Sequence, residues 1–332
     1  MSRPSHVILL GLAALAACAP RLAPPGPGPA GAPATRPGLA EERLVTADGL
    51  ALPLRHWLPE GRPRAVILAL HGFNDYSRAF EMPGSYWAEK GIATYAYDQR
   101  GFGAAPHRGL WPGTDALVAD ARTAVAALRA RHPGSPLYLL GDSMGGAVAM
   151  AAATGDAALA VDGLILAAPA VWGRAAMPAL QRGLLWLAAH TVPWMEVTGR
   201  GLDIQASDNL EVLRQLARDE LVIKSTRIDA IYGLVDLMDR ALVAGPRLEV
   251  PALLLYGESD EVIPIAPTLR LWRSLRDTTR QRPALYPTGW HMLLRDLGAE
   301  TIWDDIVAWI DDPMARLPSG ADRRARQAIV AD

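Results

Sequence analysis

Residues 137–145, LYLLGDSMG, join an apolar run to a Gly-x-Ser-x-Gly motif, and an alanine-rich segment follows at 147–153. A strand, a tight turn and a helix in this order are the setting of a nucleophile elbow. A serine hydroxyl is a weak nucleophile, so it must project from the backbone toward an activating base. The glycines of the motif leave out the Cβ atoms that would clash where strand and helix converge. We therefore interpret Ser143 as a candidate nucleophile.

Apolar runs bounded by glycine and proline recur before and after this motif. They cover residues 65–70, 92–97, 137–140, 163–168, 252–256 and 284–286. Such near-continuous runs predict strands buried on both faces of a parallel sheet. Apolar residues at helical spacing in 115–131 predict a crossover helix. Segments 42–46 and 50–57 predict a hairpin. The predicted fold class is α/β, with a mostly parallel, doubly wound sheet.

The alternation of strands and helices lapses between Ala170 and Arg247. The region contains the segment 180–189, and apolar residues recur at helical spacing in 211–221 and 227–242, so we predict a mostly helical cap. The cap is inserted before the strand that precedes Asp260. A lid over the carboxyl edge of the sheet and a structural layer without substrate contact both remain open interpretations.

The end of the chain is expected to hold one more helix, from after Gly298 to about Asp311, and then a polar tail that is loose from Ser319. The predicted organisation is, in order, a signal peptide (1–18), a linker (19–41), a core in two parts (42–169 and 248–312) around the cap (170–247), and a C-terminal tail (313–332).

A base for Ser143 is sought among the seven histidines. His291 follows the last predicted strand, and residues beyond the carboxyl ends of strands converge on one crevice in a doubly wound sheet. Asp260 follows the preceding strand and supplies the carboxylate that fixes the histidine tautomer. The chain order Ser143, Asp260, His291 is the order expected of α/β-hydrolases. The nearby carboxylates that remain alternatives are Glu258, Glu261 and Asp296, the last with a simpler interpretation as a helix cap.

Charge that develops on a substrate carbonyl oxygen needs preorganised donors. We expect one donor to be the backbone N–H of Met144, directly after the nucleophile. The other is expected from the loop His71-Gly72-Phe73-Asn74, with Phe73 as the donor and Gly72 allowing a close backbone turn. We interpret His71 as bracing this loop rather than taking part in catalysis.

Four motifs together resemble the α/β-hydrolase superfamily: HGFN at 71–74, DQRGFG at 98–103, GDSMG at 141–145 and GWH at 289–291. Within it, the chain is most similar to the monoacylglycerol lipase/lysophospholipase-like group, the serine aminopeptidase S33 type of domain, over about residues 42–312. The resemblance implies a triad of Ser143, Asp260 and His291, an oxyanion hole of Phe73 and Met144, and structural roles for Asp98 and Arg100. It implies no cofactor and no metal. The cap cannot be matched residue by residue.

The expected function is a serine ester hydrolase that forms an acyl-enzyme on monoacylglycerols or lysophospholipids. An acyltransferase or peptidase with the same triad remains an alternative, and so does a surface lipoprotein without catalysis. Apolar cap residues offer a surface for an acyl chain, or else they pack the cap onto the core. They are Leu184, Leu185, Trp186, Leu187, Trp194 and Met195.

The amino terminus has Arg3, an apolar segment at 7–17 and then Cys18, which is the pattern of a secretory signal. Residues 15–18, LAAC, also resemble a bacterial lipobox, which makes Cys18 the expected lipidation site. An ordinary signal peptide that contains a cysteine is the alternative. Cys18 is the only cysteine, so an intramolecular disulfide is excluded.

The linker is dominated by proline, glycine and alanine and is expected to be an extended tether, which at about 3.1 Å per residue reaches on the order of 60 Å. Multiple acyl chains would hold the protein firmly to a membrane. We expect a location in the cell envelope, outside the cytoplasm, on the periplasmic side of a bacterial membrane. The expected partners are a small lipid or ester substrate and a membrane surface. The net charge of -2 gives no reason to expect nucleic acid as a partner.

Overall fold

The structure is a computed structural model that describes residues 19–27, 37–155, 157–199, 201, 203–276 and 280–331. The predicted signal peptide, with Cys18, lies outside the described residues. Among the helices that are described, none is long and apolar enough to cross a membrane.

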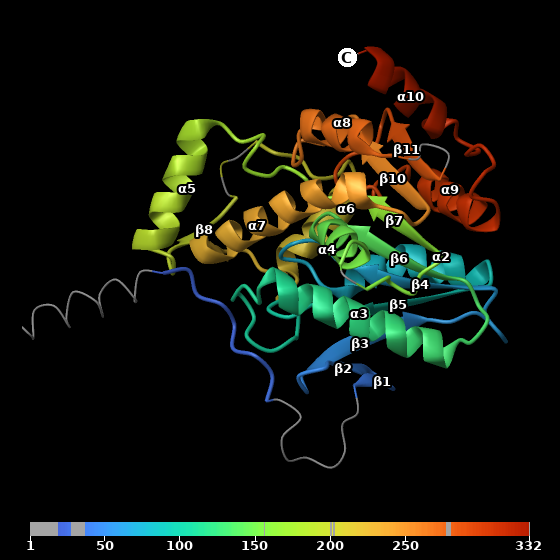
Figure 1. Ribbon diagram of the computed structural model, residues 1–332, viewed down its shortest axis with the longest axis horizontal. Coiled ribbons are helices and arrows are strands. Elements are labelled where there is room, and N and C mark those ends of the chain that lie inside the picture. Colours follow the sequence, from blue (N-terminus) through green and yellow to red (C-terminus); the bar gives the residue numbers. More distant parts are fainter. Residues whose placement is uncertain are drawn as a thin grey trace, which may run out of the picture.

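One nine-stranded sheet forms the centre of the molecule, with the strand order β1-β2-β3-β5-β4-β6-β7-β10-β11 (Figure 1). The pairing is antiparallel from β1 to β5 and parallel from β5 to β11, so the predicted doubly wound sheet is confirmed. The strands are β1 (Gly38–Ala40), β2 (Arg43–Val45), β3 (Ala51–Trp57), β4 (Ala65–Leu70), β5 (Ile92–Tyr97), β6 (Leu137–Asp142), β7 (Gly163–Ala167), β10 (Ala252–Gly257) and β11 (Gln281–Tyr286).

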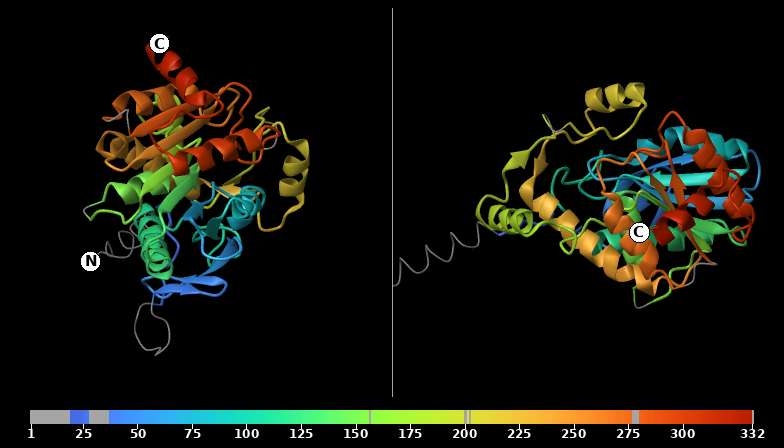
Figure 2. Two further views of the ribbon diagram at one scale, coloured as in Figure 1. Left: turned by 90° about the vertical axis from the view of Figure 1, so that its right-hand side faces the viewer. Right: turned by 90° about the horizontal axis from the view of Figure 1, so that it is seen from above.

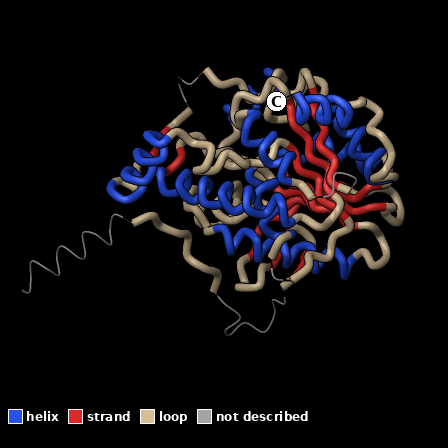
Figure 3. Tube along the Cα trace, turned by 45° about the horizontal axis from the view of Figure 1, so that its top comes forward, coloured by secondary structure: helices blue, strands red, loops and turns tan. Residues whose placement is uncertain are grey.

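Both faces of the sheet are covered by helices, as Figure 3 shows for the strands in red and the helices in blue. In β4, Val66 and Leu68 belong to one apolar core and Ala65 and Ile67 to the other, as the two-residue period of a strand requires. The first face is covered by α3 (Thr114–Arg131), α4 (Met144–Ala153), α7 (Ile228–Ala244) and α8 (Ile265–Ser274). The second is covered by η1 (Ser77–Phe80), α2 (Glu81–Glu89) and α9 (Ala299–Asp311).

The cap is the insertion between β7 and β10. It contains α5 (Ala179–Thr191), β8 (Glu196–Val197), α6 (Leu210–Arg218), β9 (Thr226–Arg227) and α7, and η2 (Gly245–Arg247) follows. The antiparallel pair β8–β9 is a small separate sheet. Figure 2 shows α5 and α6 standing away from the central sheet, while α7 runs back to the core and packs on α4.

The strand order positions the candidate site. After β4 the chain turns to β5 on one side, whereas β6 lies on the other, so the loops after β4 and β6 meet at a topological switch point. Leu70 and Gly141 are register partners at these strand ends. Gly257 and Tyr286 are partners at the ends of β10 and β11, so the loops that carry Asp260 and His291 also emerge side by side.

The two ends of the described chain differ from expectation. The predicted loose tail is a helix, α10 (Ala321–Ala331), because its small apolar residues pack on β11: Ala321 and Ala325 are fully buried. Arg324 of α10 also donates a hydrogen bond to the Leu285 carbonyl. Two described parts of the expected linker are bound to the domain: residues 38–40 form β1, and residues 20–26 contact the domain.

Candidate active site

The elbow places Ser143 in a strained conformation at the start of α4, with φ 50° and ψ −112°. Such a conformation of a non-glycine residue costs on the order of 1 to 3 kcal/mol and persists where the surrounding structure enforces it. Here the enforcement includes a hydrogen bond from Ser143 N to the Ala167 carbonyl at 2.9 Å. A Cβ atom on Gly141 would lie 2.3 Å from the Gly145 carbonyl oxygen. A Cβ on Gly145 would lie 2.0 Å from the Leu70 carbonyl oxygen, so both glycines are required.

His291 and Asp260 complete a hydrogen-bonded chain with Ser143. Ser143 Oγ lies 3.0 Å from His291 Nε2, and His291 Nδ1 lies 2.8 Å from Asp260 Oδ2. Because a carboxylate only accepts, Nδ1 carries the proton and Nε2 is left to accept from the serine hydroxyl. The other oxygen of Asp260 accepts from the backbone N–H groups of Val262 and Ile263, which fixes the carboxylate. The structure thus brings the three predicted residues together.

Burial and charge act on His291 in opposite directions. Burial alone would lower the pKa of the imidazole, but the hydrogen bond and charge of Asp260, together with the charge of Asp142, outweigh it and raise the pKa. Asp260 therefore stabilises the imidazolium that forms when His291 takes a proton. Ser143 itself remains partly exposed, so its hydroxyl is accessible while its two partners are buried.

The alternative carboxylates have other roles. Glu258 is exposed, and Glu261 accepts a hydrogen bond from the backbone of Gln205 in the cap. Asp296 accepts from Ser207 Oγ at 2.6 Å and from Trp290 N at 2.8 Å, so it fixes the loop before His291 rather than capping a helix by its side chain.

The predicted oxyanion donors are both available. Within the described residues, neither the Phe73 N–H nor the Met144 N–H donates a hydrogen bond to the protein. The loop that carries Phe73 lies close to the nucleophile, because a Cβ on Gly72 would be 3.5 Å from Ser143 Cβ. Two unpaired N–H groups near the serine can bind a developing oxyanion.

His71 braces this loop, as expected. Its Nδ1–H donates to the Gly72 carbonyl at 2.8 Å, and its Nε2 accepts from Gln99 N at 2.9 Å. Gln99 in turn donates from its side chain to the His71 carbonyl. Burial lowers the pKa of His71, which keeps the ring neutral in this arrangement.

A buried ion cluster that no sequence motif indicated lies beside the triad. Arg295 donates to Asp75 at 2.6 Å and lies 3.9 Å from Asp142 Oδ2. Burial raises the pKa of Asp142 to about 6. The three residues connect the oxyanion loop, the elbow and the His291 loop. Because they come from three distant parts of the chain, no local pattern reveals their contact.

The residues of the DQRGFG motif are structural. Asp98 accepts from the backbone N and the side-chain Oγ of Ser77, at 3.0 and 2.5 Å, and from the backbone of Ala104. Arg100 is buried between Asp48 and Asp120 and binds both carboxylates. These contacts hold the turn after β5 and leave no side chain of the pair directed at Ser143.

The apolar cap residues are mostly exposed rather than buried beneath the cap. Only Leu185 is partly buried. The exposed fractions are 55% for Leu184, 55% for Trp186, 51% for Leu187, 49% for Trp194 and 45% for Met195.

Taken together, the site contains an accessible nucleophile, an oriented base and two oxyanion donors, which is the set of groups that acyl transfer requires. In the described ranges, no cluster of histidine, cysteine, aspartate and glutamate has an arrangement that could hold a metal ion.

Comparison with known proteins gives three kinds of similarity. The family model described as serine aminopeptidase, S33, matches residues 61–298. The chain is 27% identical over 285 residues to monoglyceride lipase of Mus musculus, covering 83% of this chain and 92% of that protein. It is 24% identical to monoacylglycerol lipase of Mycolicibacterium smegmatis, with coverages of 82% and 96%. The fold is also similar to the solved structure of a soluble variant of monoglyceride lipase from Saccharomyces cerevisiae in complex with a substrate analog, with a TM-score of 0.68. The two chains are 19% identical, and the match covers 87% of this chain and 100% of that chain.

Proposed function

Because the chain belongs to the serine aminopeptidase S33 family and has the α/β-hydrolase fold, we propose that this carboxylic ester hydrolase cleaves monoacylglycerols through an acyl-enzyme on Ser143. The observation that carries the proposal is the hydrogen-bonded chain from Ser143 through His291 to Asp260. The named relatives are monoglyceride lipases, and their chains are covered almost end to end.

The geometry supports a two-step reaction. Ser143 Oγ attacks the ester carbonyl while its proton passes to His291 Nε2, and the Phe73 and Met144 N–H groups bind the resulting oxyanion. Collapse of this intermediate breaks the ester bond, and His291 returns the proton to the departing glycerol oxygen. A water molecule, deprotonated by His291, then attacks the acyl carbonyl and releases the fatty acid and free Ser143. Loss of one oxyanion donor in such a site typically costs about 10² to 10³ in rate.

A substrate panel tests the proposed chemistry. We expect kcat/KM for 1-oleoylglycerol to exceed that for lysophosphatidylcholine and for aminoacyl p-nitroanilides, and Ser143→Ala to abolish turnover without changing the thermal unfolding midpoint. Added acceptor alcohols separate hydrolysis from acyl transfer. Fatty acid as the main product supports hydrolysis, whereas a preference for the nitroanilides or dominant transfer to the alcohol contradicts the proposal.

For the location, we propose a lipid anchor on Cys18 that holds the protein at the envelope membrane, outside the cytoplasm. The support is the signal pattern and the sequence LAAC at residues 15–18. The Cys18→Ser variant is expected to move from the membrane fraction to the soluble fraction, while Ser143→Ala stays with the membrane. Equal partitioning of the two variants contradicts the anchor.

A further inference from the structure

The segment expected to be a free tether lies against the hydrolase domain from Pro20 to Gly26, and we call these residues the strap. An isolated parallel β-bridge joins Leu22 to Trp111, in the loop between β5 and α3. Three backbone N–H groups of the strap donate to the domain: Arg21 N to Asp229 Oδ2 at 3.4 Å, Ala23 N to the Trp111 carbonyl at 2.7 Å, and Gly26 N to Asp48 Oδ2 at 2.7 Å.

The burial of the strap has a period of three residues. Pro20, Ala23 and Gly26 are half-buried, whereas the residues between them are exposed. A polyproline II helix has three residues per turn, so these three positions share one face, and that face is directed at the domain. Gly26 is needed there, because a Cβ on it would lie 2.4 Å from the Asp48 carbonyl oxygen. The proline-rich sequence is therefore fitted to a particular surface.

The two carboxylates that accept hydrogen bonds from the strap are each bound by an arginine of the domain. Asp48, in the turn between β2 and β3, binds Arg100, and this hydrogen bond lowers the pKa of Asp48 well below its usual range. Asp229, at the start of α7, is buried and binds Arg227 at 2.5 Å. Both acceptors are thus fixed without the strap, and their charge strengthens the bonds that it donates.

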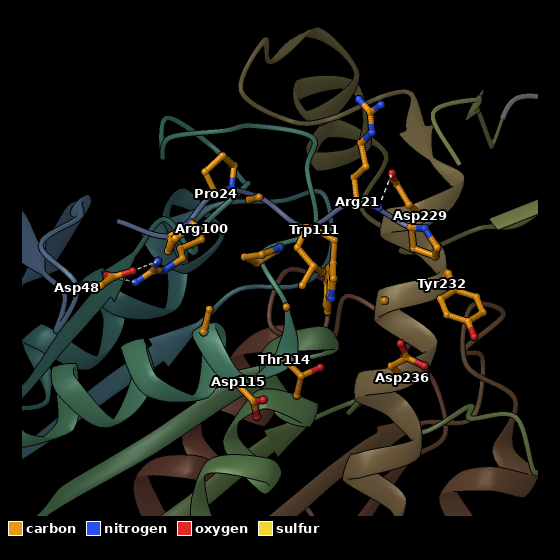
Figure 4. Close-up of a pocket in the computed structure, with 18 residues that line it drawn as sticks. Arg21, Pro24, Asp48, Arg100, Trp111, Thr114, Asp115, Asp229, Tyr232 and Asp236 are labelled. Atoms are coloured by element: carbon orange, nitrogen blue, oxygen red, sulfur yellow. Dashed lines mark hydrogen bonds and ion pairs between the residues drawn. The ribbon is translucent and has the colours of Figure 1, made fainter. Parts of the chain in front are cut away.

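Trp111 ties the middle of the strap to the cap and to the catalytic centre. The ring is buried against α7, where a Cβ on Gly233 would lie 2.2 Å from Trp111 Cδ1. Its centroid is 6.3 Å from that of Phe73, the predicted oxyanion residue. A cavity of about 510 Å³ lies between the strap and the surface around Trp111 and Tyr232 (Figure 4). The strap is therefore held at discrete points rather than along its whole length.

We propose that the strap fixes where the amino terminus leaves the domain and so holds the anchored enzyme against the lipid surface with its cap side toward it. This inference rests on the proposed anchor at Cys18. Three residue steps separate Cys18 from Arg21, so at about 3.6 Å per residue no more than roughly 11 Å of chain lies between the anchor and the first hydrogen-bonded residue of the strap. A free tether would allow on the order of 60 Å at about 3.1 Å per residue.

The contacts around Asp229 show on which side the amino terminus leaves the domain. Asp229, which binds Arg21, donates from its own backbone to the Pro193 carbonyl, and Ile228 donates to the Met195 carbonyl. Figures 1 and 2 agree that the described amino-terminal end lies beside α5 and β8. The exposed apolar residues Trp194 and Met195 are in the same region, so a short anchor brings an apolar surface toward the membrane.

Hydrogen exchange tests the docking without any lipid. In the chain from residue 18 onward, prepared as Cys18→Ser, we expect the amides of Ala23 and Gly26 to exchange at least about tenfold more slowly than in a free peptide of the same sequence, since each is hydrogen-bonded. Gly26→Ala is expected to remove this protection, whereas Pro27→Ala, at the adjacent exposed position, retains it. Exchange of both amides at free-peptide rates in the unsubstituted strap overturns the proposal.

Energy transfer to labelled vesicles tests the orientation. A fluorophore on Leu187→Cys in α5 is expected to transfer more efficiently to acceptor lipids than one on Gln327→Cys in α10, which Figure 1 places at the opposite side. Gly26→Ala should lose this difference while the protein stays bound. Equal transfer from both positions with the intact strap overturns the orientation. Absence of vesicle binding shows instead that the anchor at Cys18 is wrong, and the exchange result still decides the docking.

Discussion

At Asp260 a single carboxylate determines which nitrogen of His291 can act as the base. The Asp260→Asn variant keeps the shape of the side chain, but its amide N–H group can donate to His291 Nδ1. This favours the tautomer with the proton on Nε2, so that Nε2 can no longer accept the proton of the Ser143 hydroxyl. We expect kcat to fall about 10⁴-fold, as replacement of the aspartate does in a related triad. The measurement is kcat on a soluble p-nitrophenyl ester. Glu261→Gln, a neighbouring exposed carboxylate, is the matched control, and an equal loss in both variants would argue against the assignment.

The raised pKa of His291 sets the pH dependence of activity. Only the neutral ring accepts the serine proton, so activity is expected to fall as the pH drops through a value above the ordinary imidazole pKa of about 6.5. Asp142→Asn removes one of the charges that raise this pKa, so the midpoint of the acid limb should shift to lower pH. Glu258→Gln, on the exposed surface, should leave it unchanged. A profile of kcat/KM against pH that is the same in all three proteins contradicts this account.

The raised pKa of His291 also makes the free energy of unfolding depend on pH. Because the folded protein binds the His291 proton more tightly than the unfolded chain does, this group contributes stability that is fully present below the unfolded pKa. The contribution is lost as the pH rises through the folded pKa. The site is active when the His291 ring is neutral. In that pH range the raised pKa of His291 therefore adds nothing to the free energy of unfolding.

Among the elements, the buried strands were predictable and the elements that depend on distant contacts were not. Residues 65–70 and 92–97 were expected as strands and are β4 and β5, because apolar side chains on both faces leave little alternative. Helix α2 was not predicted, because Pro83 and Gly84 weaken its helical pattern. Gly84 is there for packing, because a Cβ on it would lie 2.6 Å from the Trp57 ring.

Helix α10 is expected to be part of the folded domain. Ala325→Asp places a carboxylate at a fully buried position against the core, so the free energy of unfolding should fall by about 3 kcal/mol or more. Gln327→Asp, on the exposed side of the same helix, controls for the change in charge and helix propensity. Urea unfolding curves measure both. Equal midpoints would show that the tail is loose, as its polar composition indicated.

For the molecule as a whole, sequence order was enough to predict that Ser143, Asp260 and His291 come together, because a doubly wound sheet brings its carboxyl-end loops to one crevice. It was not enough to find the Arg295 cluster or the strap, which depend on contacts between residues 22 to 220 positions apart, such as Gly26 with Asp48 and Arg295 with Asp75. The proline-rich composition of residues 19–41 predicted a linker, but composition carries no information on which surface such a segment contacts.

We propose that Ser143 carries the acyl group during the reaction. This assignment can be examined by peptide mapping with mass spectrometry after treatment with a fluorophosphonate probe. We predict one adduct, on the peptide that contains Ser143, and its loss in both His291→Ala and the denatured protein, because the hydroxyl is reactive only beside the oriented base. An adduct on another serine, or continued ester hydrolysis by Ser143→Ala, would contradict the claim.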